Sequence, residues 1–176
     1  VDLQHLCGSE LRSRIAVIPQ DPYLWSGSLR ANIDPANRYS GEAVLEALGR
    51  CRLAARFGAA AAERGDESLL DFPVSDAGCN FSVGERQLLC LCRALLKRSS
   101  LCLLDEATAN IDSASEAQVQ EVVGDAFARA TVIVVAHRLQ TVRGSDVVLR
   151  LDAGRVVAFG PPSEVLPADA PKACSR

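Results

Sequence analysis

Two short segments of this 176-residue chain carry residue types that can bind a phosphate and a metal ion. One is the heptapeptide FSVGERQ at 81–87, in which Ser82 is predicted to begin a helix. Helix N-termini present unpaired N–H groups to anions. The other is the acidic pair Asp105 and Glu106, which follows the apolar stretch 101–104. A carboxylate at the end of a buried strand can hold Mg²⁺, so the two segments together indicate phosphate chemistry at a metal-bearing site.

The serine segment also has a purely structural interpretation. Ser82 and Glu85 fit the capping box S-x-x-E, in which the hydroxyl accepts from the N–H of Glu85 and the carboxylate accepts from the N–H of Ser82. Gly84 lacks a Cβ and lets another surface approach the bare N–H groups. A cap and a phosphate contact share this geometry, so both interpretations stay open.

The acidic pair likewise has an alternative. Asp105 can be a helix N-cap and Glu106 an acid in the first helical turn, where negative charge is favourable. In the functional interpretation, Asp105 holds the metal, and Glu106 points to the other face and activates a water molecule.

Polar residues follow two further strand-like runs. Gln20 comes shortly after the β-branched run 15–18, and His137 directly follows the apolar run 131–136. Ligands of open α/β sheets bind at the carboxyl edge of the strands. We therefore expect Gln20, Asp105 and His137 to converge there, although a lone histidine is more often structural.

Hydrophobic spacing predicts helices in the first half of the chain and alternating strands and helices in the second. The buried strands 101–104 and 131–136 are expected in a parallel sheet covered on both faces. The other expected elements are a strand at 15–18, helices at 28–33, 41–57 and from Ser82 to about 98, a surface connection at 59–66, a helix with Val119, Val122, Val123 and Phe127 facing inward, a hairpin turning at 152–155, and a loosely ordered tail after Gly160.

Composition narrows the class of protein. With 48% hydrophobic residues, the chain can bury a core. A net charge of -3 without a basic cluster argues against a nucleic-acid partner. The seven cysteines include no CxxC pair, so reduced thiols in a reducing compartment are expected. Methionine is absent, from which we expect a segment of a longer protein.

These residues resemble the nucleotide-binding domain of ATP-binding-cassette (ABC) transporters, most closely the C subfamily of multidrug-resistance-type exporters. The resemblance covers about 11–166, and five motifs occur in the order of that family. They are similar to the Q-loop at 18–22, the ABC signature at 81–87, the Walker B strand at 103–108, the D-loop at 109–112 and the switch-histidine loop at 136–138.

The resemblance implies an α/β fold, in which a P-loop ATPase-type parallel-sheet core carries an inserted α-helical signature subdomain. The expected domain limits are 1–20 for the end of a core strand and the Q-loop, 21–100 for the helical signature subdomain, 101–160 for the α/β core and 161–176 for a C-terminal tail.

The resemblance also implies ATP and Mg²⁺ as cofactors and assigns roles by position. These roles are Glu106 as general base toward water, Asp105 as holder of the Mg²⁺ shell, Gln20 at Mg²⁺ or the attacking water, His137 at the γ-phosphate, Ser82 and Gly84 at the γ-phosphate of an ATP held mainly by a partner domain, and Asp112 across the interface between the two domains.

Two departures from the family pattern stand out. The phosphate-gripping sequence G-x-x-x-x-G-K-[ST] does not occur, because neither of the two lysines, Lys97 and Lys172, follows such glycines. We expect that loop upstream of Val1. In addition, Glu85 stands where the subfamily usually has glutamine, and its carboxylate can turn back on its own helix.

The implied function is that of an ATPase domain on the cytoplasmic face of a membrane exporter. Its expected partners are a second nucleotide-binding domain, joined head to tail, and transmembrane domains docked near Tyr23–Trp25, for which core packing is the alternative. Two other functions remain possible: a soluble ABC ATPase, and a truncated product that binds a partner without turning over ATP.

Overall fold

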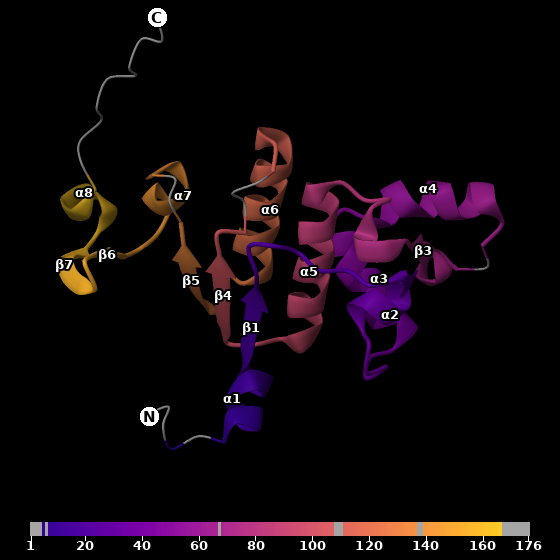
Figure 1. Ribbon diagram of the computed structural model, residues 1–176, viewed down its shortest axis with the longest axis horizontal. Coiled ribbons are helices and arrows are strands. Elements are labelled where there is room, and N and C mark those ends of the chain that lie inside the picture. The colour runs from indigo at the N-terminus through magenta and orange to yellow at the C-terminus, as the bar shows by residue number, and fades with distance from the viewer. Residues whose placement is uncertain (1–4, 6, 67, 108–110, 137–138, 167–176) are drawn as a thin grey trace, which may run out of the picture. The chain divides into compact units, whose positions relative to one another are not determined.

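The computed structural model describes residues 5, 7–66, 68–107, 111–136 and 139–166 (Figure 1). The chain divides into two compact units, Val1–Val135 and Ala136–Arg176. Each unit has its own secondary structure and is described by itself.

The first unit contains a three-stranded parallel sheet. Its strands β1 (Ile15–Ile18), β4 (Leu101–Asp105) and β5 (Thr131–Val135) lie in the order β1-β4-β5. Ile18 pairs with Leu104, and Asp105 pairs with Val135, so the carboxyl ends of the strands meet at one edge. The predicted α/β class with a parallel sheet is confirmed.

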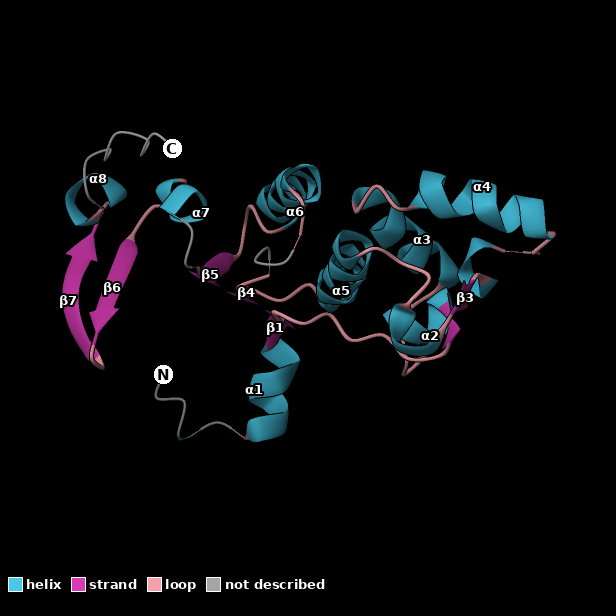
Figure 2. Ribbon diagram, turned by 45° about the horizontal axis from the view of Figure 1, so that its top comes forward, coloured by secondary structure: helices cyan, strands magenta, loops and turns pink. Residues whose placement is uncertain are grey.

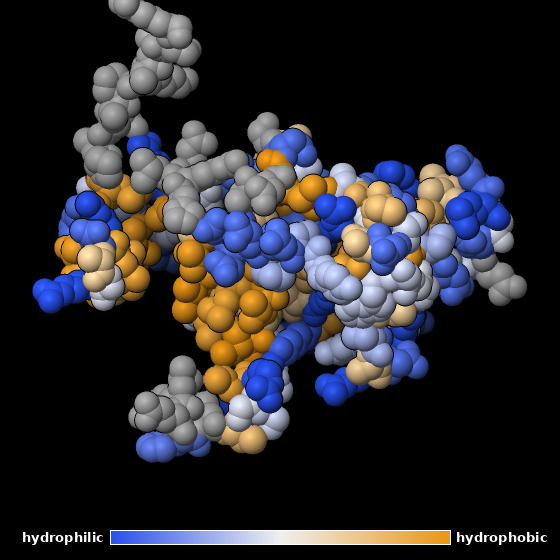
Figure 3. Space-filling model, in the orientation of Figure 1, coloured by the Kyte–Doolittle hydropathy of each residue, from blue (hydrophilic) through white to orange (hydrophobic). Residues whose placement is uncertain are grey.

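The sheet buries one of its faces. Ala16, Ile18, Cys102 and Leu104 point into the core, where α5 (Val83–Lys97) and α6 (Ser113–Ala126) pack (Figure 2). The opposite face is apolar but exposed, and Figure 3 shows it as a continuous hydrophobic surface. Its large exposed side chains are Val17 at 57%, Ile133 at 50% and Val135 at 52% exposure.

The prediction of a sheet covered on both faces is therefore wrong for the described part of the chain. Strand β5 departs most from the predicted burial, because none of its residues is buried. An apolar run shows that a strand can be covered, but it does not show which element covers it.

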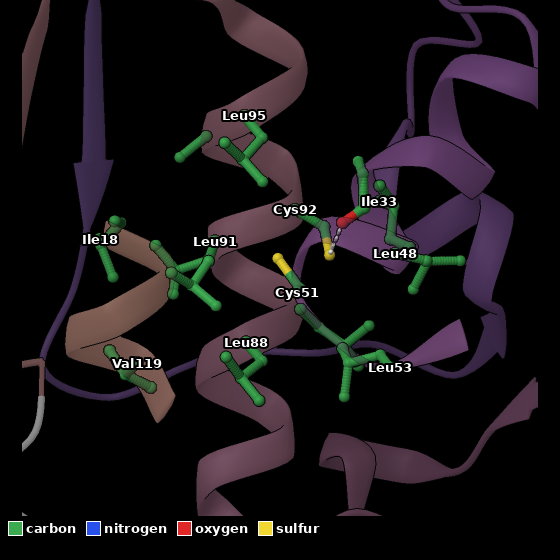
Figure 4. Close-up of a cluster of buried hydrophobic side chains, with 14 of the residues drawn as sticks. Ile18, Ile33, Leu48, Cys51, Leu53, Leu88, Leu91, Cys92, Leu95 and Val119 are labelled. Carbon is green, nitrogen blue, oxygen red and sulfur yellow. Dashed lines mark hydrogen bonds between the residues drawn. The ribbon is translucent and has the colours of Figure 1, made fainter. Parts of the chain in front are cut away.

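Helix α5 is the central element of the first unit. Ten of its fifteen residues are buried, which requires neighbours on more than one side. Leu91 and Leu95 face Ile18 of the sheet, and Cys92 faces the opposite side, toward Ile33 and Leu48 (Figure 4). Arg98 ends the helix in a left-handed conformation with φ 48°.

The remaining elements of the first unit are short. They are α1 (Gly8–Arg14), the β-bridge pair β2 (Gly27–Ser28) and β3 (Pro73–Val74), α2 (Leu29–Ile33), α3 (Gly41–Arg50), α4 (Ala54–Arg64) and two 3-10 turns at Leu69–Asp71 and Asp76–Gly78. Phe57 of α4 meets Phe72 and Phe81, with ring centroids 5.5 and 5.1 Å away, and these rings join the helices into one core.

The single helix predicted at 41–57 is wrong, and so is the surface connection predicted at 59–66. The chain forms two helices, α3 and α4, because it turns at Arg52, whose φ is 60°, while the N–H of Leu53 reaches back to the carbonyl of Leu48. The alanine-rich stretch continues α4, as the high helix propensity of alanine favours.

The second unit contains the helix α7 (Leu139–Arg143), the antiparallel strands β6 (Val148–Asp152) and β7 (Arg155–Gly160), and the helix α8 (Pro162–Val165). Ala153 and Gly154 both have positive φ, 44° and 74°, as a two-residue hairpin turn requires. The predicted hairpin is confirmed. The predicted loose tail is wrong where α8 forms, and 167–176 lie outside the described residues.

Four cysteines, namely Cys51, Cys90, Cys92 and Cys102, are buried with free thiols. Burial raises the pKa of the Cys102 thiol to about 11, so this side chain stays neutral at physiological pH. These cysteines act as small hydrophobic residues, as predicted. Among the residues that the structure describes, no helix is long and apolar enough to span a bilayer.

The central position of α5 leads to a test of stability. Leu91 is fully buried, so Leu91→Ala is expected to lower the free energy of unfolding by about 2–5 kcal/mol. Leu45→Ala on α3 is the matched control, because Leu45 is 38% exposed. Its expected loss in the free energy of unfolding is about 1 kcal/mol or less. Urea unfolding of the 176-residue chain measures both, and equal losses would contradict the central role of α5.

Candidate functional site

The first cluster of candidate residues lies at the carboxyl edge of the sheet. Gln20 follows β1 and Glu106 follows β4, and the Nε2 of Gln20 donates to the Oε2 of Glu106 across 3.2 Å. Asp105, the last residue of β4, is exposed beside them. The structure therefore brings Gln20 to the acidic pair through Glu106, whereas the prediction named Asp105, and His137 lies outside the described residues.

The backbone at Glu106 explains how the acidic pair is presented. Its N–H donates to the carbonyl of Val135 across 3.0 Å, which extends the β4–β5 ladder by one residue. Its φ is 44°, a left-handed conformation that is costly for a residue with a Cβ and is often found at functional sites. The alternative of a helix N-cap at Asp105 is wrong, because the next described helix, α6, begins at Ser113.

The donor atoms at this edge suit Mg²⁺, which prefers oxygen ligands. Asp105 offers an exposed carboxylate. Because the amide nitrogen of Gln20 already contacts Glu106, its amide oxygen is the atom that would face a cation. Asp105 and Gln20 are thus the residues that would hold the ion, which would neutralise phosphate charge there.

The second cluster lies at the N-terminus of α5. The Oγ of Ser82 accepts from the N–H of Glu85 at 3.1 Å, and the Oε2 of Glu85 accepts from the N–H of Ser82 at 2.8 Å. The predicted capping box is therefore confirmed. The Oε1 of Glu85 also forms an ion pair with the Nε of Arg56 at 3.1 Å. The extra negative charge of Glu85 is thereby turned toward its own helix and the guanidinium group of Arg56.

Gly84 is buried against a part of its own chain. A Cβ built on Gly84 would lie 2.6 Å from the Oγ and 2.7 Å from the Cβ of Ser115, which is in the first turn of α6. Such distances do not occur between real atoms of this kind. The surface that approaches Gly84 in this structure is therefore α6.

Asp112 caps α6. Its Oδ1 accepts from the N–H groups of Ala114 and Ser115 at 3.1 and 3.0 Å. Hydrogen bonds from Ser115 hold the pKa of the Asp112 carboxyl below its ordinary value. The carboxylate of the predicted D-loop residue therefore has a structural role at the helix end nearest Gly84.

Three polar side chains, those of Asn32, Gln87 and Arg93, fix the loop that follows β1, and no role was predicted for any of them. Gln87 is buried on α5, and its Nε2 donates to the carbonyl of Pro19 at 2.9 Å. Arg93 donates to the carbonyls of Asn32 at 2.7 Å and Tyr23 at 2.9 Å. The sequence signal for Gln87 is its place at the end of the signature motif, and for Arg93 it is the position between apolar residues of a buried helix.

The same network holds the aromatic residues of this loop. The guanidinium group of Arg93 lies over the ring of Trp25, 4.8 Å from its centroid. The buried side chain of Asn32 accepts from the N–H of Trp25 at 3.1 Å and donates to its carbonyl at 2.9 Å. Tyr23 is 65% exposed, whereas Leu24 is fully buried, so the core-packing alternative holds for Leu24.

The parallel-sheet fold and the two clusters can be set beside known proteins. A family model described as ABC transporter matches residues 1–109. ABC transporter C family member 6 of Arabidopsis thaliana is 46% identical over 157 residues, which make up 89% of this chain and 10% of that protein. ATP-binding cassette sub-family C member 2 of Homo sapiens is 44% identical over 166 residues, which make up 94% of this chain and 10% of that protein.

The chain belongs to the ABC transporter family, and its relatives are C-family members, as predicted. It spans about a tenth of the length of these relatives.

The cap at Asp112 leads to a pH-dependent expectation. Because its pKa is lowered in the folded chain, the stability that the charged carboxylate contributes is present at neutral pH and is lost as the pH falls through that pKa. Asp112→Ala is expected to lower the urea midpoint of unfolding at pH 7, and the difference from the unchanged chain is expected to shrink in acid. A difference that does not change with pH would contradict the charged cap.

Proposed function

We propose that this chain is the ATP-hydrolysing part of a nucleotide-binding domain in a C-family membrane exporter. The observation that carries the proposal is the hydrogen bond between Gln20 and Glu106 beside Asp105, at the carboxyl edge of the parallel sheet. In phosphoryl transfer to water, the residue that acts as base and the residue that holds the metal must lie close together, because the base and the metal act on the same water molecule.

Each residue of this cluster has a role in the proposal. Glu106 accepts a proton from the attacking water, and the amide of Gln20 holds that carboxylate in place. Asp105 and Gln20 would hold Mg²⁺, which would supply charge neutralisation at the phosphates. His137 contacts the γ-phosphate, a role that rests on the match of the switch-histidine motif alone.

The signature end serves a second nucleotide in the proposal. Ser82 and Gly84 begin a fifteen-residue helix, whose N-terminus favours an anion. Arg56 pairs with the carboxylate of Glu85 and reduces its repulsion of a phosphate. The nucleotide itself is held mainly by a second nucleotide-binding domain arranged head to tail, with Asp112 at the interface between the two.

Transport requires a connection to membrane domains. The exposed ring of Tyr23 and the half-buried ring of Trp25 are the proposed contact, on the cytoplasmic face of the membrane. The relatives belong to the C family of ABC transporters, which favours an exporter over a soluble ABC ATPase. The net charge of -3 supports the proposal that no nucleic acid is a partner.

The base assignment is tested in a full-length C-family transporter in which these residues form part of a nucleotide-binding domain. Glu106→Gln keeps the shape of the side chain and removes its basicity, so ATP hydrolysis is expected to fall by about 10²- to 10⁴-fold while ATP stays bound. Glu46→Gln on α3, where the glutamate is exposed, is the control and is expected to leave hydrolysis unchanged. Unchanged hydrolysis in Glu106→Gln would overturn the assignment.

A second experiment uses the 176-residue chain by itself. The sequence contains no G-x-x-x-x-G-K-[ST] loop, and the proposed signature contacts serve a nucleotide held elsewhere. The purified chain is therefore expected to show no ATP binding at micromolar concentrations in isothermal titration calorimetry. Micromolar affinity would show that the described clusters bind ATP without a partner.

A further inference from the structure

The close approach of α5 and α6 at their N-termini explains why a glycine occupies position 84. The nearest atoms to a Cβ on Gly84 would be the Oγ and Cβ of Ser115, at 2.6 and 2.7 Å, and the next is the Cα of Ser115 at 4.0 Å. All the crowding thus comes from one side chain, and without that side chain the remaining distance is an ordinary van der Waals contact.

Ser115 cannot easily move away from position 84. Its Cβ is attached directly to the helix backbone, and its N–H is bonded to the Oδ1 of Asp112 at 3.0 Å. The rest of α6 is fixed by the fully buried Val119 and by the Nε2 of Gln118, which donates to the carbonyl of Cys51 at 3.2 Å. A side chain at position 84 would therefore have to displace the beginning of one of the two helices.

The two helix ends that meet here belong to different proposed sites. Ser82 begins α5, at the signature end, and Asp112 begins α6, on the segment that leads away from Glu106. Helix α5 also holds the loop of Gln20, through the hydrogen bond from Gln87 to the carbonyl of Pro19. A contact that fixes these ends relative to each other links the hydrolytic cluster to the signature cluster within one domain.

We propose that Ser115 is a positioning residue: its contact with Gly84 sets the distance between the N-termini of α5 and α6, so that their capping residues Ser82 and Asp112 are held in a fixed relation. The proposal rests on the proposed function. It explains the missing Cβ at position 84 by packing inside this chain, and it leaves the N–H of Gly84 in its proposed place at the phosphate. The alternative explains the missing Cβ by the close approach of a phosphate or a partner domain.

The two explanations differ in one measurable respect. If Ser115 is what Gly84 accommodates, then Ser115→Gly creates the space that Gly84→Ala fills. Ser115→Ala does not, because it keeps the Cβ that would lie 2.7 Å away. If a phosphate or a partner is what Gly84 accommodates, neither change at 115 relieves Gly84→Ala.

The experiment is a set of variants in the full-length transporter, with kcat and KM measured for ATP hydrolysis. Gly84→Ala is expected to lower kcat by about tenfold or more, which corresponds to about 1.4 kcal/mol. For the double variant Gly84→Ala with Ser115→Gly, kcat is expected to lie within about threefold of the kcat of Ser115→Gly alone. Such a recovery is the signature of two residues that interact directly. The double variant with Ser115→Ala is expected to stay as slow as Gly84→Ala.

Gly124→Ala on α6, the helix of Ser115, is the control glycine, because nothing lies within 4 Å of a Cβ there. It is expected to leave kcat unchanged. Ser115→Val gives a second readout with Gly84 intact: it crowds the same contact and is expected to lower kcat without raising the KM for ATP.

The same variants are also made in the 176-residue chain and unfolded in urea. If Gly84→Ala prevents folding, adding Ser115→Gly must restore it, and adding Ser115→Ala must not. Failure of Ser115→Gly to relieve Gly84→Ala in both measurements overturns the inference. Failure of the proposed function is seen separately, as unchanged hydrolysis in Glu106→Gln.

Discussion

The burial of α5 on both sides is the constraint on which the rest of the first unit depends. One side packs on the sheet near Ile18, and the other packs on α2 and α3 near Ile33 and Leu48. The helix has no face left for solvent along most of its length, so its polar residues must find partners inside the chain. Gln87 and Arg93 do so by bonding to backbone carbonyls, and in that way the core determines the shape of the loop after Gln20.

The same helix connects the two clusters of candidate residues. Its N-terminus carries the exposed Ser82, while its buried length contacts the loop that carries Gln20. The hydrolytic edge and the signature end are therefore not independent parts of the surface. The charge of Glu85 is handled locally, by the capping box and by Arg56, and the core is not needed to compensate it.

Local rules predicted much of this structure from the sequence. The capping box at Ser82 and the hairpin turn at Ala153–Gly154 follow from residue types at fixed offsets, and the meeting of Gln20 with Glu106 follows from the geometry of parallel strands. The break between α3 and α4 was not predicted, because the spacing of apolar residues continues across it. The exposure of β5 and the partners of Gln87 and Arg93 could not be predicted either, since burial and backbone acceptors depend on segments far away in the sequence.

The hydrogen bond between Gln20 and Glu106 joins residues that are 86 positions apart, and the whole helical region lies between them in the chain. Closing a loop of this size costs conformational entropy before any contact within the sheet repays it. Helices such as α3 and α4 contain mainly local contacts and can form before that closure. We therefore expect the edge that carries Gln20 and Glu106 to assemble late in folding.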